Sequence, residues 1–391
     1  MSNARHAEVV GAGFAGLAAA CALAQRGWSV RVHERADQLR TTGAGIYIYE
    51  NGLRVLEALG AYADAVESAP IAHTREVRDD GNRVVSVHRW DRSSRVFSIV
   101  RQQVINALAD AARRHGVEIL TQSQASAATP DGELILADGR RLRADLIVAA
   151  DGTNSRLRDS LGLLSKRKPL ADGAIRLLID RISQDRAAGE PGTTIEYWSG
   201  TRRVLYTPCS QDLVYVALTM LDRDAVAKAV PLHKDAWISW FPHLRDLIAR
   251  LGDDGRYDRF ELIKLKRWSS GRVAVVGDAA HALPPNIGQG GGCAMMNGLS
   301  LAVYLDRFVD VSCALEAWER NERPLTDHTQ RMSYLLGLPT SWPPALRTKA
   351  FAWAGRSTWI IKQRTLTAHH RPTGTVSAER LTTALELQRG G

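Results

Sequence analysis

The sequence predicts an α/β protein in which a parallel βαβ unit is interleaved with a β-sheet layer and followed by a helical C-terminal tail. Residues 7–34 read as a strand, a glycine-rich turn, a helix and a second strand. Residues 168–266 are dominated by short segments of strand character, and apolar residues recur at helical spacing from Leu299 onward. With 391 residues, 45% of them hydrophobic and 24% charged, the chain has the composition of a globular protein with two structural units.

The glycine turn carries the first functional signal. Gly11, Gly13 and Gly16 form a GxGxxG pattern between a buried strand and an alanine-rich helix. Gly11 permits a tight turn, Gly13 lets the backbone approach a pyrophosphate, and Gly16 lets helix and strand pack closely. Glu34 ends the second strand, where a carboxylate can bind both hydroxyls of an adenosine ribose. The pattern predicts a Rossmann-like dinucleotide site, and Glu34 argues against a 2′-phosphate because two negative charges would face each other.

The middle of the chain returns to this unit after a group of strands. Residues 71–100 alternate like antiparallel strands, and Arg101 then begins an amphipathic helix, RQQVINALADAARRHG. Further along, DLIVAADG reads as a buried strand that ends at Asp151. Either Asn154 or Ser155 can cap the helix that follows.

Residues 277–297, GDAAHALPPNIGQGGGCAMMN, form a second chemistry-bearing stretch after the apolar strand RVAVV. A strand that passes through a glycine bend into a helix directs free backbone N–H groups at the start of the helix, which suits a phosphate or an electron-rich ring. Asp278 at the strand end can accept hydrogen bonds from a sugar hydroxyl. Pro284 and Pro285 offer carbonyls but no donors and stiffen the loop between the two halves of the stretch.

Charge and cysteine usage exclude several classes of protein. The formal charge of +9 is spread along the chain without a block of like charges or a basic run interleaved with aromatics, so we expect no nucleic-acid partner. The positive charge instead favours attraction of a small anionic substrate. The N-terminus enters a strand directly, and no apolar run approaches the length of a membrane span, so we expect a cytoplasmic protein without a membrane partner. No metal centre is evident in the sequence, and we expect none. The cysteines form no CxxC and are expected to be free thiols: Cys21, Cys209, Cys293 and Cys313.

Three motifs therefore stand in order: GxGxxG with Glu34, Asp151-Gly152, and Gly277-Asp278. This triplet resembles the class A flavin-dependent aromatic monooxygenases, which include p-hydroxybenzoate and salicylate hydroxylases, over the chain up to about residue 335. The segments GAGIYIYENGLRVLEALG, ADLIVAADG, RRVLYTPC and GDAAHA are most similar to the 2-methyl-3-hydroxypyridine-5-carboxylate oxygenase branch. The resemblance implies an FAD-binding domain at 1–70, 101–167 and 267–335, a substrate domain at 71–100 and 168–266, and a helical region at 336–391.

The resemblance also implies how the cofactor is held. The glycine loop and Glu34 would hold the ADP half of FAD, Asp278 would bind its ribityl or pyrophosphate region, and residues 288–292 would lie along the isoalloxazine. Arg101 matches an arginine at the start of the helix that lies against the flavin. Asp151 matches a motif linked to FAD and to transient docking of NADH or NADPH. The expected cofactor-binding residues are Gly11, Gly13, Phe14, Ala15, Gly16, Glu34, Arg35, Arg40, Arg101, Asp151, Asp278, Gly288, Gly290 and Gly291.

The same resemblance implies which residues contact the substrate. Arg203 and Tyr215 match positions that face the substrate from the middle sheet, where a charged fork and a hydroxyl would orient an anion. The alternative for both is an ordinary pair on a solvated strand face. Tyr47 and Pro284 are expected to line the pocket, although strand aromatics are also common in cores. Arg75 stands where the branch carries a tyrosine, which implies a different or additional acidic group on the substrate. The residues expected to act in catalysis are Arg203, Tyr215 and Pro285.

The implied reaction is hydroxylation of a small anionic hydroxylated aromatic or N-heteroaromatic ring, such as a hydroxypyridine carboxylate, with ring opening as a variant. Such enzymes use NAD(P)H and O₂ and react through a flavin C4a-hydroperoxide. Three alternatives stay open: a salicylate-type decarboxylating hydroxylase, a flavin-dependent reductase that acts without O₂, and a flavoprotein that serves as a partner-binding redox module. A homodimer is the first assembly to test.

Two further features receive a structural interpretation. His281 in GDAAHA is expected to brace the turn by packing rather than to act in catalysis. Residues 342–359 combine Trp and Phe with Arg and Lys, the composition of a helix at a membrane surface. We expect this region instead to pack on the domain or to form a dimer contact.

Overall fold

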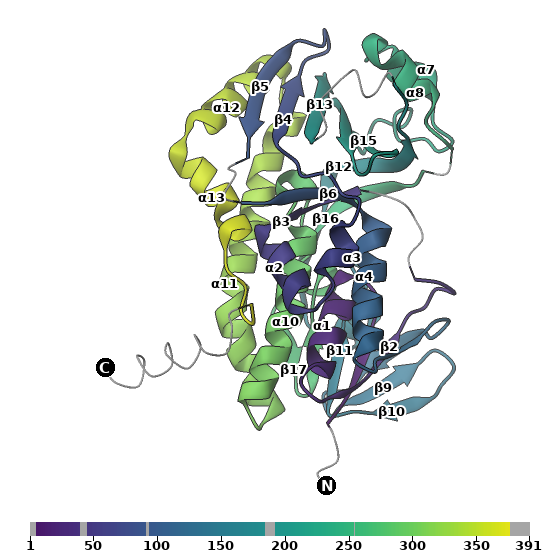
Figure 1. The fold of residues 1–391 in the computed structure, drawn as a ribbon, viewed down its shortest axis with the longest axis vertical. Helices are drawn as coiled ribbons and strands as arrows, with labels where there is room; N and C mark the ends of the chain where they lie inside the picture. Colours follow the sequence, from purple (N-terminus) through teal and green to yellow (C-terminus); the bar gives the residue numbers. More distant parts are fainter. Residues whose placement is uncertain (1–4, 40–44, 91–93, 184–191, 254, 376–391) are drawn as a thin grey trace.

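The computed structural model describes residues 5–39, 45–90, 94–183, 192–253 and 255–375. Figure 1 shows an elongated molecule in which one sheet with its helices forms the lower part and a second sheet forms the upper part. The helix α11 (Val311–Gly337) runs along one side of the molecule. The mixed α/β class with a helical C-terminal region is therefore confirmed.

The lower part is built on a six-stranded sheet. Its strand order is β17-β18-β11-β1-β2-β7, and all neighbours are parallel except the edge strand β17. The helix α1 (Phe14–Ala24) connects the first two strands as the glycine pattern predicted. The strands are β1 (His6–Val10), β2 (Ser29–His33), β7 (Glu118–Leu120), β11 (Leu146–Ala149), β17 (Ser269–Ser270) and β18 (Val273–Val275).

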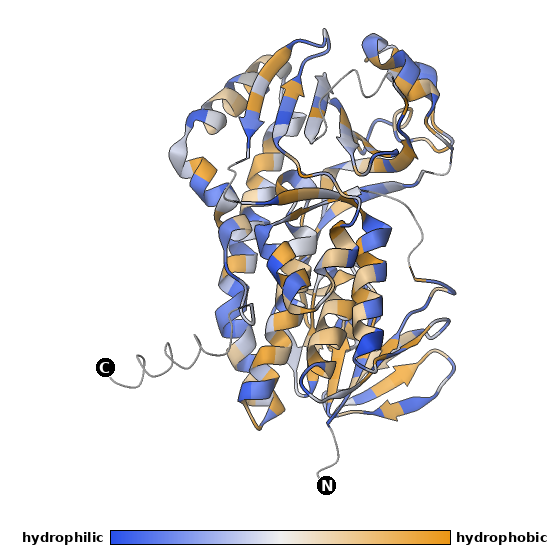
Figure 2. Ribbon diagram, viewed as in Figure 1, coloured by the Kyte–Doolittle hydropathy of each residue, from blue (hydrophilic) through white to orange (hydrophobic). Residues whose placement is uncertain are grey.

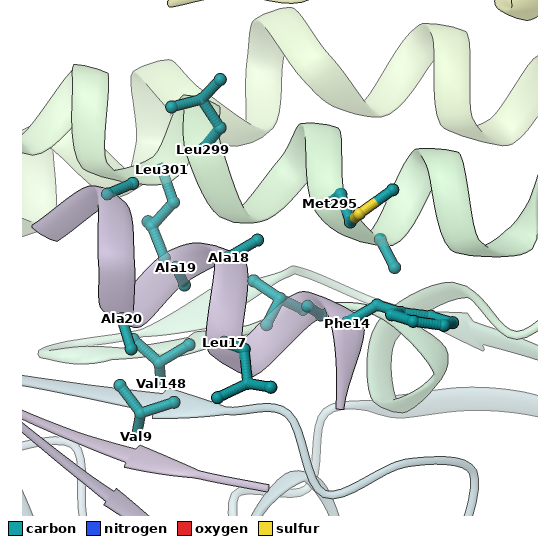
Figure 3. Close-up of a cluster of buried hydrophobic side chains, with 14 of the residues drawn as sticks. Val9, Phe14, Leu17, Ala18, Ala19, Ala20, Val148, Met295, Leu299 and Leu301 are labelled. Atoms are coloured by element: carbon teal, nitrogen blue, oxygen red, sulfur yellow. The ribbon is translucent and has the colours of Figure 1, made fainter. Parts of the chain in front are cut away.

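The core of this part is the contact between α1 and α10 (Gly290–Arg307). Figure 3 shows Val9 and Val148 of the sheet on one side of α1, and Met295 and Leu299 of α10 on the other. The two helices approach closely because small residues face each other: a Cβ at Gly298 would lie 2.7 Å from the Ala15 carbonyl oxygen. Because α1 is rich in alanine, α10 can pack closely against it, and residues of α1 and α10 that are distant in sequence come into contact.

The upper part is a seven-stranded sheet in the order β16-β12-β15-β14-β13-β4-β5, antiparallel except for the pair β13 and β4. One face packs against the short helices α7 (Lys234–Ile238) and α8 (Arg245–Ala249), with Ile195 and Val204 among its buried residues. Because successive side chains alternate, the other face receives polar residues. The strands are β4 (Thr74–Arg78), β5 (Val84–Arg89), β12 (Leu164–Asp180), β13 (Thr193–Ser199), β14 (Arg202–Pro208), β15 (Leu213–Leu221) and β16 (Tyr257–Leu265).

A two-stranded sheet, β3 (Gly45–Tyr49) with β6 (Val96–Val100), lies between the two parts. A three-stranded sheet of β8, β9 and β10 lies at the lower edge. Figure 2 shows many apolar residues in the central helices and in the strands, and a mixture of polar and apolar residues along α11. The division into domains stays a prediction. The remaining elements are α2 (Glu50–Ala58), α3 (Tyr62–Val66), α4 (Arg101–Arg114), β8 (Ala125–Ala128), β9 (Glu133–Leu136), β10 (Arg141–Arg143), α5 (Arg156–Ser160), η1 (Pro242–Leu244), α9 (Asp278–His281), η2 (Pro285–Ile287), η3 (Leu338–Ser341), α12 (Pro344–Arg356) and α13 (Thr358–His369).

Candidate cofactor and substrate site

The N-terminus of α1 is shaped by its glycines to receive an anion. Gly11 has a φ of +104°, and a Cβ there would overlap the carbonyl oxygen of Ala150. A Cβ at Gly16 would overlap the Gly11 carbonyl, so Gly16 permits the packing of turn and helix. Gly13 differs, because a Cβ there would meet no atom within 4 Å, and the helix start has no side-chain cap. Open space and free N–H groups therefore coincide at Gly13, which fits a pyrophosphate.

Glu34 lies beside this turn at the end of β2. Its carboxylate accepts hydrogen bonds from the backbone N–H groups of Ala12 and Ala36, each at 3.0 Å. The side chain is half-buried, and the carboxylate keeps further lone pairs that can accept from sugar hydroxyls. Arg35 follows it with an exposed side chain, whereas Arg40 lies outside the described residues.

The late glycine stretch meets the first one. A Cβ at Gly277 would lie 2.7 Å from that of Ala15, so Asp278, the exposed first residue of α9, is placed beside α1. A Cβ at Gly290 would meet no atom within 4 Å, and α10 starts here without a side-chain cap. A Cβ at Gly291 would lie 3.5 Å from the Phe14 ring. The open starts of α1 and α10 thus border one region, as expected if both face the same cofactor.

Two buried amides that the sequence did not reveal lie at the start of α10. Asn51 donates from Nδ2 to Gln289 Oε1 at 2.9 Å, and both side chains are almost fully buried. Within the described part of the chain, Asn51 Oδ1 and Gln289 Nε2 have no hydrogen-bond partner. A Cβ at Gly292 would lie 3.1 Å from Gln289 Oε1, so these amides sit against the glycine run. Buried polar atoms of this kind require a partner, which a bound group can supply.

Asp151 makes its contacts within the protein. Its carboxylate accepts from the Ser155 hydroxyl at 2.5 Å and from the Arg156 N–H at 2.9 Å, so it helps to start α5. Burial raises the pKa of Asp151. The residue lies directly behind Gly11, whose Cβ would be 3.2 Å from the Asp151 nitrogen. These contacts support a role in shaping the glycine turn, and direct contact of Asp151 with a cofactor stays a prediction.

Arg158 is a second residue that the sequence did not single out. It is fully buried, and its guanidinium donates to the Thr153 carbonyl at 3.0 Å and to the Ala279 carbonyl at 3.2 Å. It therefore connects the Asp151-Gly152 turn to α9. Arg101 lies at the start of α4, with its guanidinium 4.7 Å from the centre of the Phe14 ring, which places it beside the starts of α1 and α10.

The expected substrate residues Arg75, Arg203 and Tyr215 lie on the upper sheet, and Tyr47 reaches its polar face from the two-stranded sheet. Tyr47 of β3 donates its hydroxyl to Thr194 Oγ1 at 3.1 Å and lies 2.5 Å from Thr207 Oγ1. Burial raises the pKa of Tyr47, so its hydroxyl stays protonated. Tyr215 of β15 is buried, and burial raises its pKa although Arg176 opposes the shift.

Close to these tyrosines, two arginines share one carboxylate. Glu196 Oε1 lies 3.1 Å from Arg203 Nη1, and Glu196 Oε2 pairs with Arg75. Burial alone would raise the pKa of Glu196, but Arg75 and Arg203 outweigh it and lower the pKa. The Arg203 guanidinium also stacks on Trp198, 4.8 Å from the ring centre. Glu196 is the main residue of this face that the sequence missed, and its position in TTIEYWS gave no signal.

The two prolines lie shortly before the glycine run in the sequence. The Pro284 carbonyl accepts from the Ser333 hydroxyl at 2.5 Å, and Pro285 is exposed at the start of η2. The helix η2 ends at Ile287, and a Cβ at the next residue, Gly288, would lie 3.2 Å from the Tyr49 ring. Burial raises the pKa of Tyr49, and the positive charge of Arg75 opposes this shift. Tyr49 therefore links the segment before α10 to the polar sheet face, and the individual cofactor and substrate roles stay predictions.

His281 is packed inside the protein, in agreement with its structural interpretation. Its Nε2 lies 2.9 Å from Asn297 Nδ2, and its ring lies 5.4 Å from that of Trp268. Burial lowers the pKa of His281 to about 4, so the residue is neutral at physiological pH.

This pKa leads to a prediction about stability. The pKa of His281 is lower in the folded chain than in the unfolded chain, so its contribution is complete above about pH 6.5 and is lost as the pH falls toward 4. We expect the free energy of unfolding to fall by about 3 kcal/mol over this range on account of His281. Denaturant titration at several pH values should show a shallower decline for His281→Gln, and parallel declines would contradict the assignment.

The architecture and the joined glycine sites define an FAD-binding oxidoreductase, and comparison with known proteins agrees. A family model described as "FAD binding domain" matches residues 6–310. The chain therefore belongs to this family, and it is an FAD-dependent aromatic monooxygenase.

Individual relatives extend this result. The 2-heptyl-3-hydroxy-4(1H)-quinolone synthase of Mycobacteroides abscessus is 41% identical over 378 residues, which cover 92% of this chain and 98% of the relative. An FAD-dependent urate hydroxylase of Mycolicibacterium vanbaalenii is 30% identical, covering 81% and 84%. The solved tetrameric form of 2-methyl-3-hydroxypyridine-5-carboxylic acid oxygenase is 38% identical, with a TM-score of 0.84 and coverage of 95% and 98%. The expected branch is thus confirmed as a structural neighbour.

Proposed function

We propose that this protein is a monooxygenase that uses NAD(P)H and O₂ to hydroxylate a 4(1H)-quinolone ring at C3. The ring is an N-heteroaromatic system whose tautomer carries a hydroxyl group, as the sequence suggested, but it is neutral whereas the sequence suggested an anionic substrate. The balanced reaction joins the quinolone, O₂, NAD(P)H and a proton to give the 3-hydroxyquinolone, NAD(P)⁺ and water. The name of the 41% identical relative supports this choice of ring.

The observation that carries the proposal is the charge balance of the polar sheet face. The Arg75 and Arg203 side chains both contact Glu196, and Arg203 Nη2 also lies 3.8 Å from Asp172 Oδ2. Two arginines that already share carboxylates offer less net charge to a substrate anion than their number suggests. They can still donate hydrogen bonds, as guanidinium groups carry several donors. This arrangement favours a neutral ring with a polarisable oxygen, such as the 4-oxygen of a quinolone, over a carboxylate.

The protein residues then have distinct tasks. When bound, FAD takes a hydride from NAD(P)H and activates O₂ for transfer of one oxygen atom. Arg203 would donate a hydrogen bond to the 4-oxygen and so fix the position of the ring, whose C3 is already electron-rich because the ring nitrogen donates electron density to it. The protonated Tyr215 and Tyr47 would help to orient the ring. The backbone around Pro284 and Pro285 would close the wall between ring and glycine run and keep water out.

A second candidate is hydroxylation, with ring opening, of a hydroxypyridine carboxylate. The 38% identical oxygenase favours it, because its name specifies such a substrate. In that case Arg75 or Arg203 would exchange Glu196 for the substrate carboxylate. The use of NADH or NADPH as the reductant and a location in the cytoplasm are further parts of this proposal.

The test is a panel of 2-heptyl-4(1H)-quinolone, hydroxypyridine carboxylates and hydroxybenzoates, scored by NAD(P)H oxidation, O₂ uptake and product mass. We expect the quinolone to stimulate both rates and to gain one oxygen atom. A carboxylate that gains two oxygen atoms would establish the second candidate, loss of CO₂ would indicate a decarboxylating hydroxylase, and turnover without O₂ a reductase.

In the same assay, Arg203→Ala should raise the dissociation constant of the quinolone about ten- to a hundredfold, the usual cost of a lost hydrogen bond from a charged donor. The FAD content should not change, because Arg203 belongs to the upper sheet. Arg141→Ala, which removes a surface partner of Glu133, is the matched control. Unchanged quinolone binding would remove Arg203 from the site.

A further inference from the structure

The C-terminal helices α12 and α13 each have two different faces. The inner face of α12 packs on the upper sheet: the Arg347 guanidinium lies 4.5 Å from the centre of the Trp198 ring, and the Phe351 ring lies 5.5 Å from it. The inner face of α13 packs on α11, where His328 Nε2 lies 3.0 Å from the Gln363 carbonyl. The expected packing of this region on the domain holds for these inner faces.

The outer faces carry the same pattern twice. Residues three and seven positions apart lie on one side of a helix. On α12 this side presents Leu346, Lys349 and Trp353, and Trp353 is 68% exposed. On α13 the equivalent side presents Trp359, Lys362 and Leu366, with Trp359 65% exposed. Large apolar side chains at this exposure form a surface that requires an explanation.

The segment that contains these two helices carries charge of one sign. Between Asp327 and Glu379 the sequence contains seven arginines and lysines and no aspartate or glutamate. Lys349, Arg356 and Lys362 are exposed on the outer faces. Figure 1 places α12 and α13 along one margin of the molecule, on the opposite side from α7 and α8. A second copy of the same face would oppose cation to cation, which disfavours a symmetric dimer contact here.

We propose that the outer faces of α12 and α13 bind the surface of an anionic lipid membrane. Exposed tryptophans and leucines would enter the interface between headgroups and acyl chains, and lysines and arginine would contact the anionic headgroups. No helix among the described residues is long and apolar enough to cross a bilayer, so the attachment is peripheral.

This surface also bears on the substrate, a point that rests on the proposed function. A quinolone with a heptyl chain partitions into lipid. The helix α12 contacts the membrane with one face and, through Arg347 and Phe351, touches Trp198 beside Arg203 with the other. An alkylated substrate could therefore pass from the lipid to the polar sheet face along α12 without crossing bulk water.

The test is sedimentation of the FAD-loaded full chain with vesicles in the absence of any quinolone, so its result is independent of the substrate. We expect binding to vesicles of equal parts phosphatidylglycerol and phosphatidylcholine, and at least about tenfold weaker binding to phosphatidylcholine alone. Added salt should weaken the binding to the anionic vesicles.

Two double variants locate the surface. Trp353→Ser with Trp359→Ser, and Lys349→Glu with Lys362→Glu, should each weaken binding at least about tenfold while FAD content stays unchanged. Val309→Ser, at an apolar side chain that is 99% exposed elsewhere, and Lys166→Glu with Arg223→Glu are the matched controls and should bind like the original protein. Absence of vesicle binding, or equal loss in the controls, would overturn the proposal. So would a change of oligomeric mass in the tryptophan variant without vesicle binding, which would identify a contact between copies.

Discussion

Replacing Gly13 with valine is expected to abolish FAD binding while the fold survives. The residue has a φ of −87° and a ψ of −174°, a conformation open to any residue, and a Cβ there meets no atom within 4 Å. The added side chain therefore costs the free protein little, but it fills the space that a pyrophosphate needs at the start of α1. We expect FAD affinity to fall at least about a hundredfold, or roughly 3 kcal/mol.

Flavin absorbance per protein after gel filtration measures this loss, and thermal unfolding checks the fold. Gly13→Val should unfold near the temperature of the FAD-free original protein, because the stabilisation by ligand is missing. Gly355→Val is the control. A Cβ at Gly355 also meets no atom within 4 Å, but Gly355 lies on α12, away from the start of α1. Retention of FAD by Gly13→Val would refute the location of the cofactor at α1.

Replacing Glu196 with glutamine should destabilise the protein by about 3 kcal/mol or more, the usual cost of leaving a buried charge without its partner. Glu196 is 3% exposed and pairs with both Arg75 and Arg203, so one substitution affects two cations. Because the neighbouring arginines lower the pKa of Glu196, its contribution is present above the ordinary pKa of a glutamate and is lost only in stronger acid.

Denaturant unfolding of the FAD-loaded protein measures this effect. The control is Glu133→Gln, which removes a similar ion pair at the surface: Glu133 lies 2.8 Å from Arg141, whose side chain is 63% exposed. Surface pairs of this type contribute about 1 kcal/mol or less. Equal losses for the two variants would show that the Glu196 cluster is solvated rather than buried.

The sequence predicted best those parts of the site that depend on local pattern. A strand, a glycine turn and a helix are fixed by neighbouring residues, so Gly11, Gly13, Gly16 and the start of α10 could be identified directly. Glu34 followed because its place at the end of the second strand is set by the same short unit.

Contacts that depend on how elements distant in sequence pack together escaped prediction, even where one of the residues had been singled out. Arg75 reaches Glu196 only because β4 and β13 pair in parallel, with Arg75 opposite Thr194. Asn51 meets Gln289 across 238 positions of sequence. Asp151 was recognised as a motif, but its hydrogen bonds to Ser155 and Arg156 depend on the local backbone after the strand. Contacts of this kind have no period in the sequence.

The order of the strands has a practical meaning for engineering. After β2 the chain leaves the lower sheet for β4 and β5, returns for β7 and β11, leaves again for β12 to β16, and returns for β17 and β18. No single cut in the chain therefore separates the lower sheet from the upper sheet. Exchange of one contiguous fragment with a relative would replace parts of both sheets. If the upper sheet binds the substrate as proposed, we expect single substitutions in its strands to change specificity more cleanly than such an exchange.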